Sequence, residues 1–268
     1  MVISLLTTLV ALAEEPQTPA LPPTEVRVVS VYDGDTFTLE TGHKVRLQWV
    51  NTPELRPMEA YGLDARDAAR SLVDQEIVTL TYDAKDAVDG YGRLVASASF
   101  DGTDLATHLI SQGLGHLFII PPLQGDLTHL EDAQRAAKAD RLGIWSTDRY
   151  QGPLHITSFH ANARGPDHEN VHGEYLRVCN VSDAPFDMSQ ITVLDAQDHQ
   201  WSLPAVIVPV GHTVKIHSGR GEPQADPSKQ LAVYLQTDGP VWNNDGDRVR
   251  LQLPDGTVVD SRSHKGKK

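Results

Sequence analysis

Residues 25–51 read "EVRVVSVYDGDTFTLETGHKVRLQWVN" and define the character of the first half of the chain. Three segments of this stretch are rich in β-branched and aromatic residues, and short glycine-containing turns separate them. Strands that follow one another without crossover helices predict an antiparallel meander. We place the loop of one hairpin at Gly42-His43, which pairs Thr41 with Lys44.

The rest of the first half adds two more strands, at 76–83 and 91–100, and three helices. Strands in runs with interspersed helices fit a small α+β barrel of the OB-fold kind better than a parallel α/β sheet. Thr128 and Glu131 form a capping box for the third helix, and Gly143 is placed to end it. The helices are expected at 59–74, 103–113 and 129–141, and the inner face of the first should carry Leu63, Ala68, Ala69 and Leu72.

After Gly152-Pro153 the pattern changes to short strands and turns without a long helical segment. Apolar residues alternate with polar ones, as in "DRVRLQLP" at 247–254, which predicts strands with one buried face. We expect an all-β, immunoglobulin-like sandwich. The expected strands are 174–180, 190–195, 212–218, 229–237, 247–254 and 256–261.

The length of 268 residues fits two cores better than one. We divide the chain into a leader and Pro-rich spacer at 1–23, a barrel at 24–150 and a sandwich at 151–268. The two cores are expected to fold independently, so removing 152–268 should leave the chemistry of the barrel nearly unchanged.

Oxygen-bearing side chains gather at one end of the first hairpin. The predicted register brings Asp35 within about one residue of Asn51, and such oxygens suit a hard cation. Pro53 cannot continue a strand ladder, so the chain leaves the sheet there and delivers Glu54 beside the same place. Arg46 lies on the strand that leads to it. Each residue alone has an ordinary structural explanation, but their shared position favours a site.

Four motifs in order, "VYDGDTFTL", "VRLQWVNTPE", "DGYGRLVA" and "AQRAAKADRLGIW", resemble those of staphylococcal nuclease-like proteins (thermonucleases). The resemblance covers residues 24–147. It implies an OB-fold barrel and hydrolysis of DNA or RNA to 3'-phosphate products with calcium.

The resemblance also assigns residues. Asp35 and Asn51 fall on calcium-ligand positions, and Thr52 falls on the position that ligates through its backbone carbonyl. The catalytic positions are Arg46, Glu54 and Arg93. Arginine suits a phosphodiester because its planar fork binds two oxygens and keeps its proton, and a carboxylate can orient or deprotonate the attacking water.

Two positions depart from the family pattern. Asn51 stands where many relatives carry an aspartate, so calcium should bind more weakly. Ile119 occupies the position of a base-stacking tyrosine, whereas Tyr91 is retained. The alternative function is a catalytically weak OB-fold protein that binds nucleic acid or attaches to a surface.

The second half resembles a lamin-tail domain through "GEYLRVCNVSDAPFDMS", "VWNNDGDRVRL" and "DGTVVDSRS" over about 154–264. It shows no catalytic motif, and its partner is open. The histidines 155, 160, 168 and 172 match no metal-ligand spacing and are expected in a solvated loop. Trp201 and Trp242 are expected to pack in the core.

The net charge and the cysteine content limit how the protein can bind nucleic acid and whether it can form disulfides. The formal charge is -13, so nucleic acid must be held by a few focused cations rather than by a broad basic face. The single cysteine, Cys179, is expected to be a buried thiol.

Residues 2–13 are apolar and end in Ala-Leu-Ala. They resemble a signal peptide that lacks its basic start, and they are too short to span a bilayer. We therefore expect a monomer without a transmembrane span, secreted or in the cell envelope.

Overall fold

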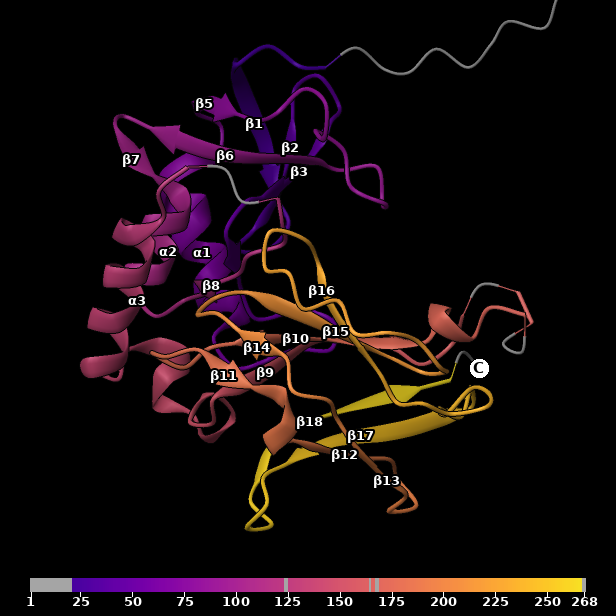
Figure 1. Ribbon diagram of the computed structural model, residues 1–268. Coiled ribbons are helices and arrows are strands. Elements are labelled where there is room, and N and C mark those ends of the chain that lie inside the picture. Colours follow the sequence, from indigo (N-terminus) through magenta and orange to yellow (C-terminus); the bar gives the residue numbers. More distant parts are fainter. Residues whose placement is uncertain (1–20, 123–124, 164, 167–168, 267–268) are drawn as a thin grey trace, which may run out of the picture.

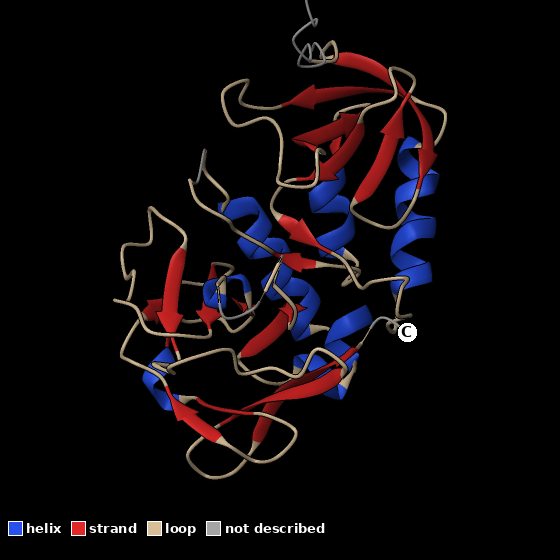
Figure 2. Cartoon of the chain, turned by 90° about the vertical axis from the view of Figure 1, so that its right-hand side faces the viewer, coloured by secondary structure: helices blue, strands red, loops and turns tan. Residues whose placement is uncertain are grey.

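The computed structural model describes residues 21–122, 125–163, 165–166 and 169–266. The predicted leader therefore lies almost wholly outside the described residues. The chain forms a barrel, indigo to magenta, above a sandwich, orange to yellow (Figure 1), and Figure 2 shows the same two parts from the side. None of the helices in the described ranges is long and apolar enough to cross a membrane.

The barrel is closed, and the predicted OB-fold is confirmed. The strand order is β3-β2-β1-β5-β6, and a parallel pairing of β3 with β6 closes the ring. Phe37, Leu39 and Val45 are fully buried inside it. The strands are β1 (Glu25–Val31), β2 (Thr36–Leu39), β3 (Lys44–Leu47), β5 (Ile77–Thr81) and β6 (Leu94–Phe100), with the short β4 (Val50–Asn51), β7 (Thr103–Asp104) and β8 (His116–Leu117) beside them.

The register of the first hairpin differs from the prediction by three residues. Lys44 pairs with Thr38 and not with Thr41. The loop contains three residues because Leu39 N donates to the His43 carbonyl over 2.9 Å, and Gly42 holds φ +85°. A three-residue hairpin loop with glycine in the left-handed region is common, and it was missed in favour of a two-residue loop.

Three helices cover the barrel: α1 (Gly62–Val73), α2 (Leu105–Ser111) and α3 (Thr128–Ala139). Their existence is confirmed, but two details are wrong. The predicted inner residue Leu63 is 44% exposed, and α1 buries Ala65, Ala69 and Val73. The predicted capping box does not form, because Asp126 accepts the Thr128 N–H over 2.9 Å.

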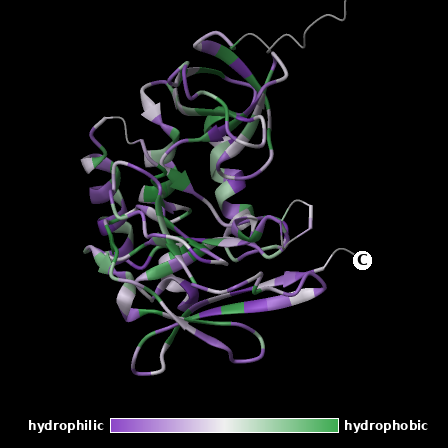
Figure 3. Ribbon diagram, turned by 45° about the vertical axis from the view of Figure 1, so that its right-hand side comes forward, coloured by the Kyte–Doolittle hydropathy of each residue, from purple (hydrophilic) through white to green (hydrophobic). Residues whose placement is uncertain are grey.

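The second half is the predicted immunoglobulin-like sandwich of two four-stranded sheets. Polar and apolar residues alternate along its strands, as the colours of Figure 3 show. Trp242 is buried and Trp201 packs against it, as expected. One sheet is β16 (Leu231–Tyr234), β15 (Thr213–His217), β10 (Tyr175–Asn180) and β9 (Leu154–His160); the other is β13 (Gln200–Ser202), β12 (Thr192–Leu194), β17 (Gly246–Gln252) and β18 (Val258–Lys265); β11 (Phe186–Asp187) pairs with β14 (Ile207–Val208).

The barrel and sandwich are joined by a third apolar cluster. It contains Ile144, Trp145 and Tyr150 from one side and Cys179 and Val181 from the other. The thiol is fully buried, and burial raises its pKa, as predicted for an inert cysteine. Each part has a core of its own, and side chains from both parts share this third cluster, which the sequence did not predict.

Backbone hydrogen bonds also cross the junction. Ile119 N donates to the Gly211 carbonyl over 2.8 Å, and Thr213 N donates to the Ile119 carbonyl over 3.1 Å. Ile119, which was expected at a base-stacking position, is 2% exposed. It serves the junction between the barrel and the sandwich.

Candidate active site

The site begins where two barrel segments touch. Asp35 Oδ2 accepts hydrogen bonds from Thr52 N over 2.9 Å and from Thr52 Oγ1 over 3.2 Å. Gly34 permits this approach, because a Cβ at that position would lie 2.7 Å from Thr52 Cγ2. Asp35 is 6% exposed and Thr52 is 3% exposed. The two predicted metal-site residues are therefore side by side, although not through the ladder register that was expected.

Arg46 on β3 reaches the same place. Its Nη2 lies 3.4 Å from Asp35 Oδ2 and donates to Asn51 Oδ1 over 3.2 Å. Its Nη1 donates to the Val50 carbonyl over 2.8 Å. The guanidinium carbon lies 5.6 Å from the centre of the Phe118 ring. One nitrogen thus contacts both proposed metal ligands, so they face a common point.

Asn51 also contacts a buried histidine on β8. The His116 Nδ1 lies 2.9 Å from the Leu117 carbonyl, which can only accept, so Nδ1 carries the proton. Burial lowers the pKa of His116 to about 3, and the ring is neutral. Its Nε2 is then an acceptor, and the Asn51 amide group lies 3.5 Å from it. An amide satisfies both neighbours, since it accepts from Arg46 and donates to His116.

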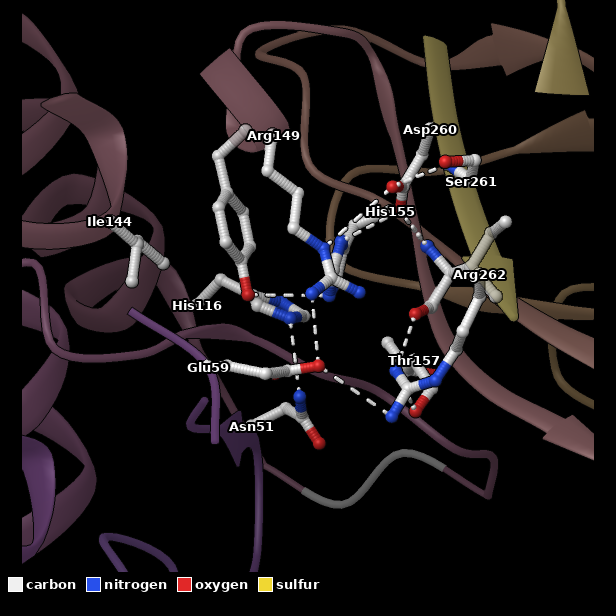
Figure 4. Close-up of polar contacts among 12 residues, drawn as sticks. Asn51, Glu59, His116, Ile144, Arg149, His155, Thr157, Asp260, Ser261 and Arg262 are labelled. Atoms are coloured by element: carbon white, nitrogen blue, oxygen red, sulfur yellow. Dashed lines mark hydrogen bonds and ion pairs between the residues drawn. The ribbon is translucent and has the colours of Figure 1, made fainter. Parts of the chain in front are cut away.

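Glu54 follows on a loop whose geometry depends on Glu59. Glu59 Oε2 accepts the Glu54 backbone N–H over 3.0 Å, and the Glu54 carbonyl accepts the Glu59 N–H over 2.8 Å. Figure 4 shows the other side of Glu59 facing the sandwich. Its Oε1 accepts from Arg149 Nη1 over 2.9 Å and lies 3.6 Å from Arg262 Nη2 on β18. A residue of the sandwich therefore supports the loop that carries Glu54.

A buried carboxylate of the sandwich extends this network. Asp260 Oδ2 accepts the Ile156 N–H over 2.7 Å and lies 2.9 Å from His155 Nδ1, and Asp260 Oδ1 lies 3.7 Å from Arg149 Nε. His155 is 1% exposed. Its predicted place in a solvated loop is wrong, because it packs against Tyr150 at the junction. His160 lies in β9 and His172 in a 3-10 helix, whereas His168 lies outside the described residues.

Negative charge accumulates around the candidate site. Burial, together with the charges of Asp35 and Glu54, raises the pKa of Asp33 to about 7. Burial also raises the pKa of Glu54, and Asp35 and Glu59 raise it further, against the lowering effect of Arg262 and Arg46. A raised pKa suits a carboxylate that exchanges protons near neutral pH.

Arg93 stands apart from this group. Its Nε donates to Asp89 Oδ2 over 2.9 Å within the loop before β6, and its guanidinium carbon lies 5.4 Å from the Tyr91 ring centre. The side chain of Arg93 is 28% exposed, and Tyr91 is 72% exposed. The structure thus brings Asp35, Arg46, Asn51 and Thr52 into contact, places Glu54 close by, and keeps Arg93 on the neighbouring loop.

Comparison with known proteins identifies the family of each half of the chain. The family model described as "Staphylococcal nuclease homologue" matches residues 44–147. A thermonuclease of Staphylococcus intermedius is 30% identical over 125 residues, which cover 44% of this chain and 74% of that protein. The chain belongs to the staphylococcal nuclease homologue family. Its second half matches the model described as "Lamin Tail Domain" at residues 147–266.

This staphylococcal nuclease homologue also resembles two proteins of Bacillus subtilis (strain 168). Endonuclease YncB is 32% identical over 126 residues, which cover 44% of this chain and 60% of that protein. The SPbeta prophage-derived endonuclease YokF is 28% identical over 134 residues, which cover 47% of this chain and 45% of that protein. The matched region thus spans roughly half of these two relatives.

Among the residues of the homologue's site that were not predicted from the sequence are Glu59, His116 and Arg262. Glu59 could have been suspected, because an acidic side chain just before a helix interacts favourably with the N–H groups of its first turn. Arg262 carried no signal of its own, since it lies more than 200 positions from Glu54.

Proposed function

We propose that this protein is a calcium-dependent nuclease that hydrolyses phosphodiester bonds of DNA or RNA and leaves 3'-phosphates. The observation that carries the proposal is the contact of Arg46 with both Asp35 and Asn51, beside the loop of Glu54. The printed names of the relatives, endonuclease and thermonuclease, support the same reaction class.

The residues have distinct tasks in this proposal. Arg46 and Arg93 neutralise charge that grows on the phosphate oxygens as water attacks, and a guanidinium does so without losing its proton. Glu54 orients or deprotonates the attacking water, which its raised pKa supports. Arg93 would leave Asp89 to reach the phosphate.

The donor set around Asp35 fits calcium. Carboxylate, amide and backbone carbonyl oxygens from Asp35, Asn51 and Thr52 are hard ligands. The described ranges hold no cluster of three or more His, Cys, Asp or Glu side chains suited to a metal. Calcium would therefore be held by one carboxylate, by neutral oxygens and by water. Burial raises the pKa of Asp33, and the charges of Asp35 and Glu54 raise it further; a divalent cation would relieve this repulsion between carboxylates. When bound, calcium would supply positive charge for the phosphate oxygens.

The test is cleavage of single-stranded DNA by the purified protein, with calcium and then with excess calcium-specific chelator. We expect cleavage only with calcium. Undiminished cleavage in chelator would refute the calcium requirement, and no cleavage in either condition would favour the alternative, a binding or surface-attachment protein. We further propose that the protein is a monomer that is secreted or held in the cell envelope, and that the barrel ends at residue 150 and the sandwich begins at residue 151.

A further inference from the structure

The outer face of the sheet β16-β15-β10-β9 carries a row of aromatic rings. Tyr175 pairs with His160 on one side and with His217 on the other, and His217 pairs with Tyr234. Paired residues point to the same side of a sheet, so the four rings lie in one row across four strands. The ring centres of His160 and Tyr175 are 4.3 Å apart, those of Tyr175 and His217 are 5.5 Å apart, and those of His217 and Tyr234 are 5.3 Å apart.

A second row on the same face is basic. Arg177 pairs with Lys215, two residues along from the rings. Lys215 Nζ lies 4.4 Å from the centre of the Tyr175 ring. The intervening Leu176 and Ile216 are fully buried in the core, so the basic and aromatic rows lie on the opposite, outer side of the sheet. The side chains of both rows are half-buried, and Arg177 Nη1 donates to Gln230 Oε1 over 3.2 Å. The four strands contain no Asp or Glu, in a chain whose formal charge is -13.

The third row ties this face to the candidate active site. Thr213 Oγ1 donates to the Ile119 carbonyl over 3.1 Å, and Thr213 is fully buried beneath the barrel. Ile119 follows Phe118, whose ring centre lies 5.6 Å from the Arg46 guanidinium carbon. In Figure 1 the sheet lies below the barrel strands β1, β2 and β3. Successive rows are about 7 Å apart, so the half-buried basic row lies one row beyond the buried junction. The ring of His172 packs beside His217 and Tyr234 at one end of the aromatic row.

The pKa of Arg177 also indicates that this face lies close to Arg46 of the candidate active site. Burial lowers the pKa of Arg177, the hydroxyls of Tyr175 and Tyr91 oppose this, and the charge of Arg46 lowers the pKa further. The guanidinium groups of Arg46 and Arg177 are therefore close enough for the charge of one to affect the other.

We propose that this surface, formed by His160, Tyr175, Arg177, Lys215, His217 and Tyr234 and here called the basic-aromatic face, binds the single-stranded part of a nucleic-acid substrate beyond the bond that is cleaved. The inference rests on the proposed nuclease function. Unpaired bases stack on rings and phosphates contact cations, which is the combination that single-strand binding surfaces use. It also explains how an acidic protein can retain a polyanion.

The test is binding of labelled oligothymidylates of about 4 and about 16 nucleotides, the range of site sizes known for single-strand binders. The full chain carrying Glu54→Gln is used, with calcium, so that cleavage does not intervene. Tyr175→Leu removes the ring and keeps an apolar strand residue, and Lys215→Gln removes the charge. Arg248→Gln, on the exposed side of β17 in the other sheet, is the matched control.

For the longer strand, the combined Tyr175→Leu and Lys215→Gln variant should raise Kd about 10- to 100-fold. Losing one phosphate contact should reduce the slope of log Kd against log salt by about 0.7. Lys215→Arg should restore that slope, and Arg248→Gln should change neither quantity. The affinity gained by lengthening the strand should largely disappear in the combined variant. Melting curves of the variants should overlay those of the parent.

A longer-strand Kd within about twofold of the parent would overturn the inference, because one stacked ring alone should contribute more. Equal competition by poly-glutamate would overturn it in favour of an acidic protein partner. Cleavage of the short strand by the unmodified protein tests the nuclease function separately. If the short strand is cut while the variants bind the long strand normally, the basic-aromatic face fails and the nuclease function stands.

Discussion

Replacing Glu59 tests whether the sandwich supports the loop that carries Glu54. The Glu59 side chain is 10% exposed and accepts from the Glu54 N–H and from Arg149. Arg262 Nη2, on β18 of the sandwich, lies 3.6 Å from Glu59 Oε1. Glu59→Ala removes all three interactions, whereas Glu59→Gln removes the charge and keeps the shape.

The expected loss of unfolding free energy follows from the hydrogen bonds and ion pairs that Glu59 makes. A hydrogen bond to a charged group contributes about 1.5–3 kcal/mol, and breaking a buried ion pair costs about 3–5 kcal/mol. Arg149 retains Asp260 at 3.7 Å, and Arg262 retains hydrogen bonds to the Ile156 and Thr157 carbonyls. We therefore expect a loss of unfolding free energy of about 3–4 kcal/mol for Glu59→Ala and about 1–2 kcal/mol for Glu59→Gln.

Thermal melts and steady-state cleavage of an oligonucleotide provide the measurement. A loss of about 3–4 kcal/mol lowers Tm by roughly 6–16 °C in a chain of this size. Displacing Glu54 by about 1 Å should lower kcat on the order of 100-fold. Asp132→Asn is the control, because its pair with Arg135 is 61% and 64% exposed and contributes about 0–1 kcal/mol. Unchanged Tm and kcat in Glu59→Ala would refute the reasoning.

A pH profile separates positioning from stability. Arg262 lowers the pKa of Glu54, whose pKa is raised overall by burial. A base works above its folded pKa, so the rate falls as pH falls through that value. Arg262→Met removes the charge and keeps the apolar stem, so the acid limb of kcat should move to higher pH. An acid limb at the parent position would show that Arg262 does not act on Glu54.

Three further outcomes are expected. Glu54→Gln should lower kcat by several orders of magnitude while oligonucleotide binding survives, because base strength is lost and shape is kept; equal losses of both would make Glu54 structural. Asn51→Asp should lower the calcium concentration at half-maximal cleavage, because it adds a carboxylate. It should also lower Tm, because His116 Nε2 loses its donor. An unchanged calcium midpoint would show that Asn51 is not a ligand. Deleting 152–268 should reduce solubility, since it uncovers the apolar cluster that the two parts share. It should also reduce kcat, since it removes Arg262 from Glu59. A folded, fully active fragment would contradict both expectations.

The sequence by itself predicted the strands of the barrel, the three helices and the residues that gather at the site, whereas β9, β11, β13 and β14 of the sandwich were not predicted. Alternating apolar residues define a strand wherever one face is buried, and this held for both parts of the chain. The motif residues Asp35, Arg46, Asn51 and Thr52 lie within 18 positions of one another. Their encounter depends on one hairpin and the loop after it, so local pattern was enough to bring them together.

Only the tertiary structure decided the register of that hairpin and the partners of its loop. Pairing at Thr38–Lys44 depends on the conformation of a three-residue loop, which residue types alone do not specify. Glu59 meets Arg149 and Arg262, and Asn51 meets His116, across separations of 65 to 203 positions. Hydrophobic periodicity reports which face of an element is buried, but not which remote element covers it. The partner of a long charged side chain is set by how whole domains pack, and it therefore leaves no local signal in the sequence.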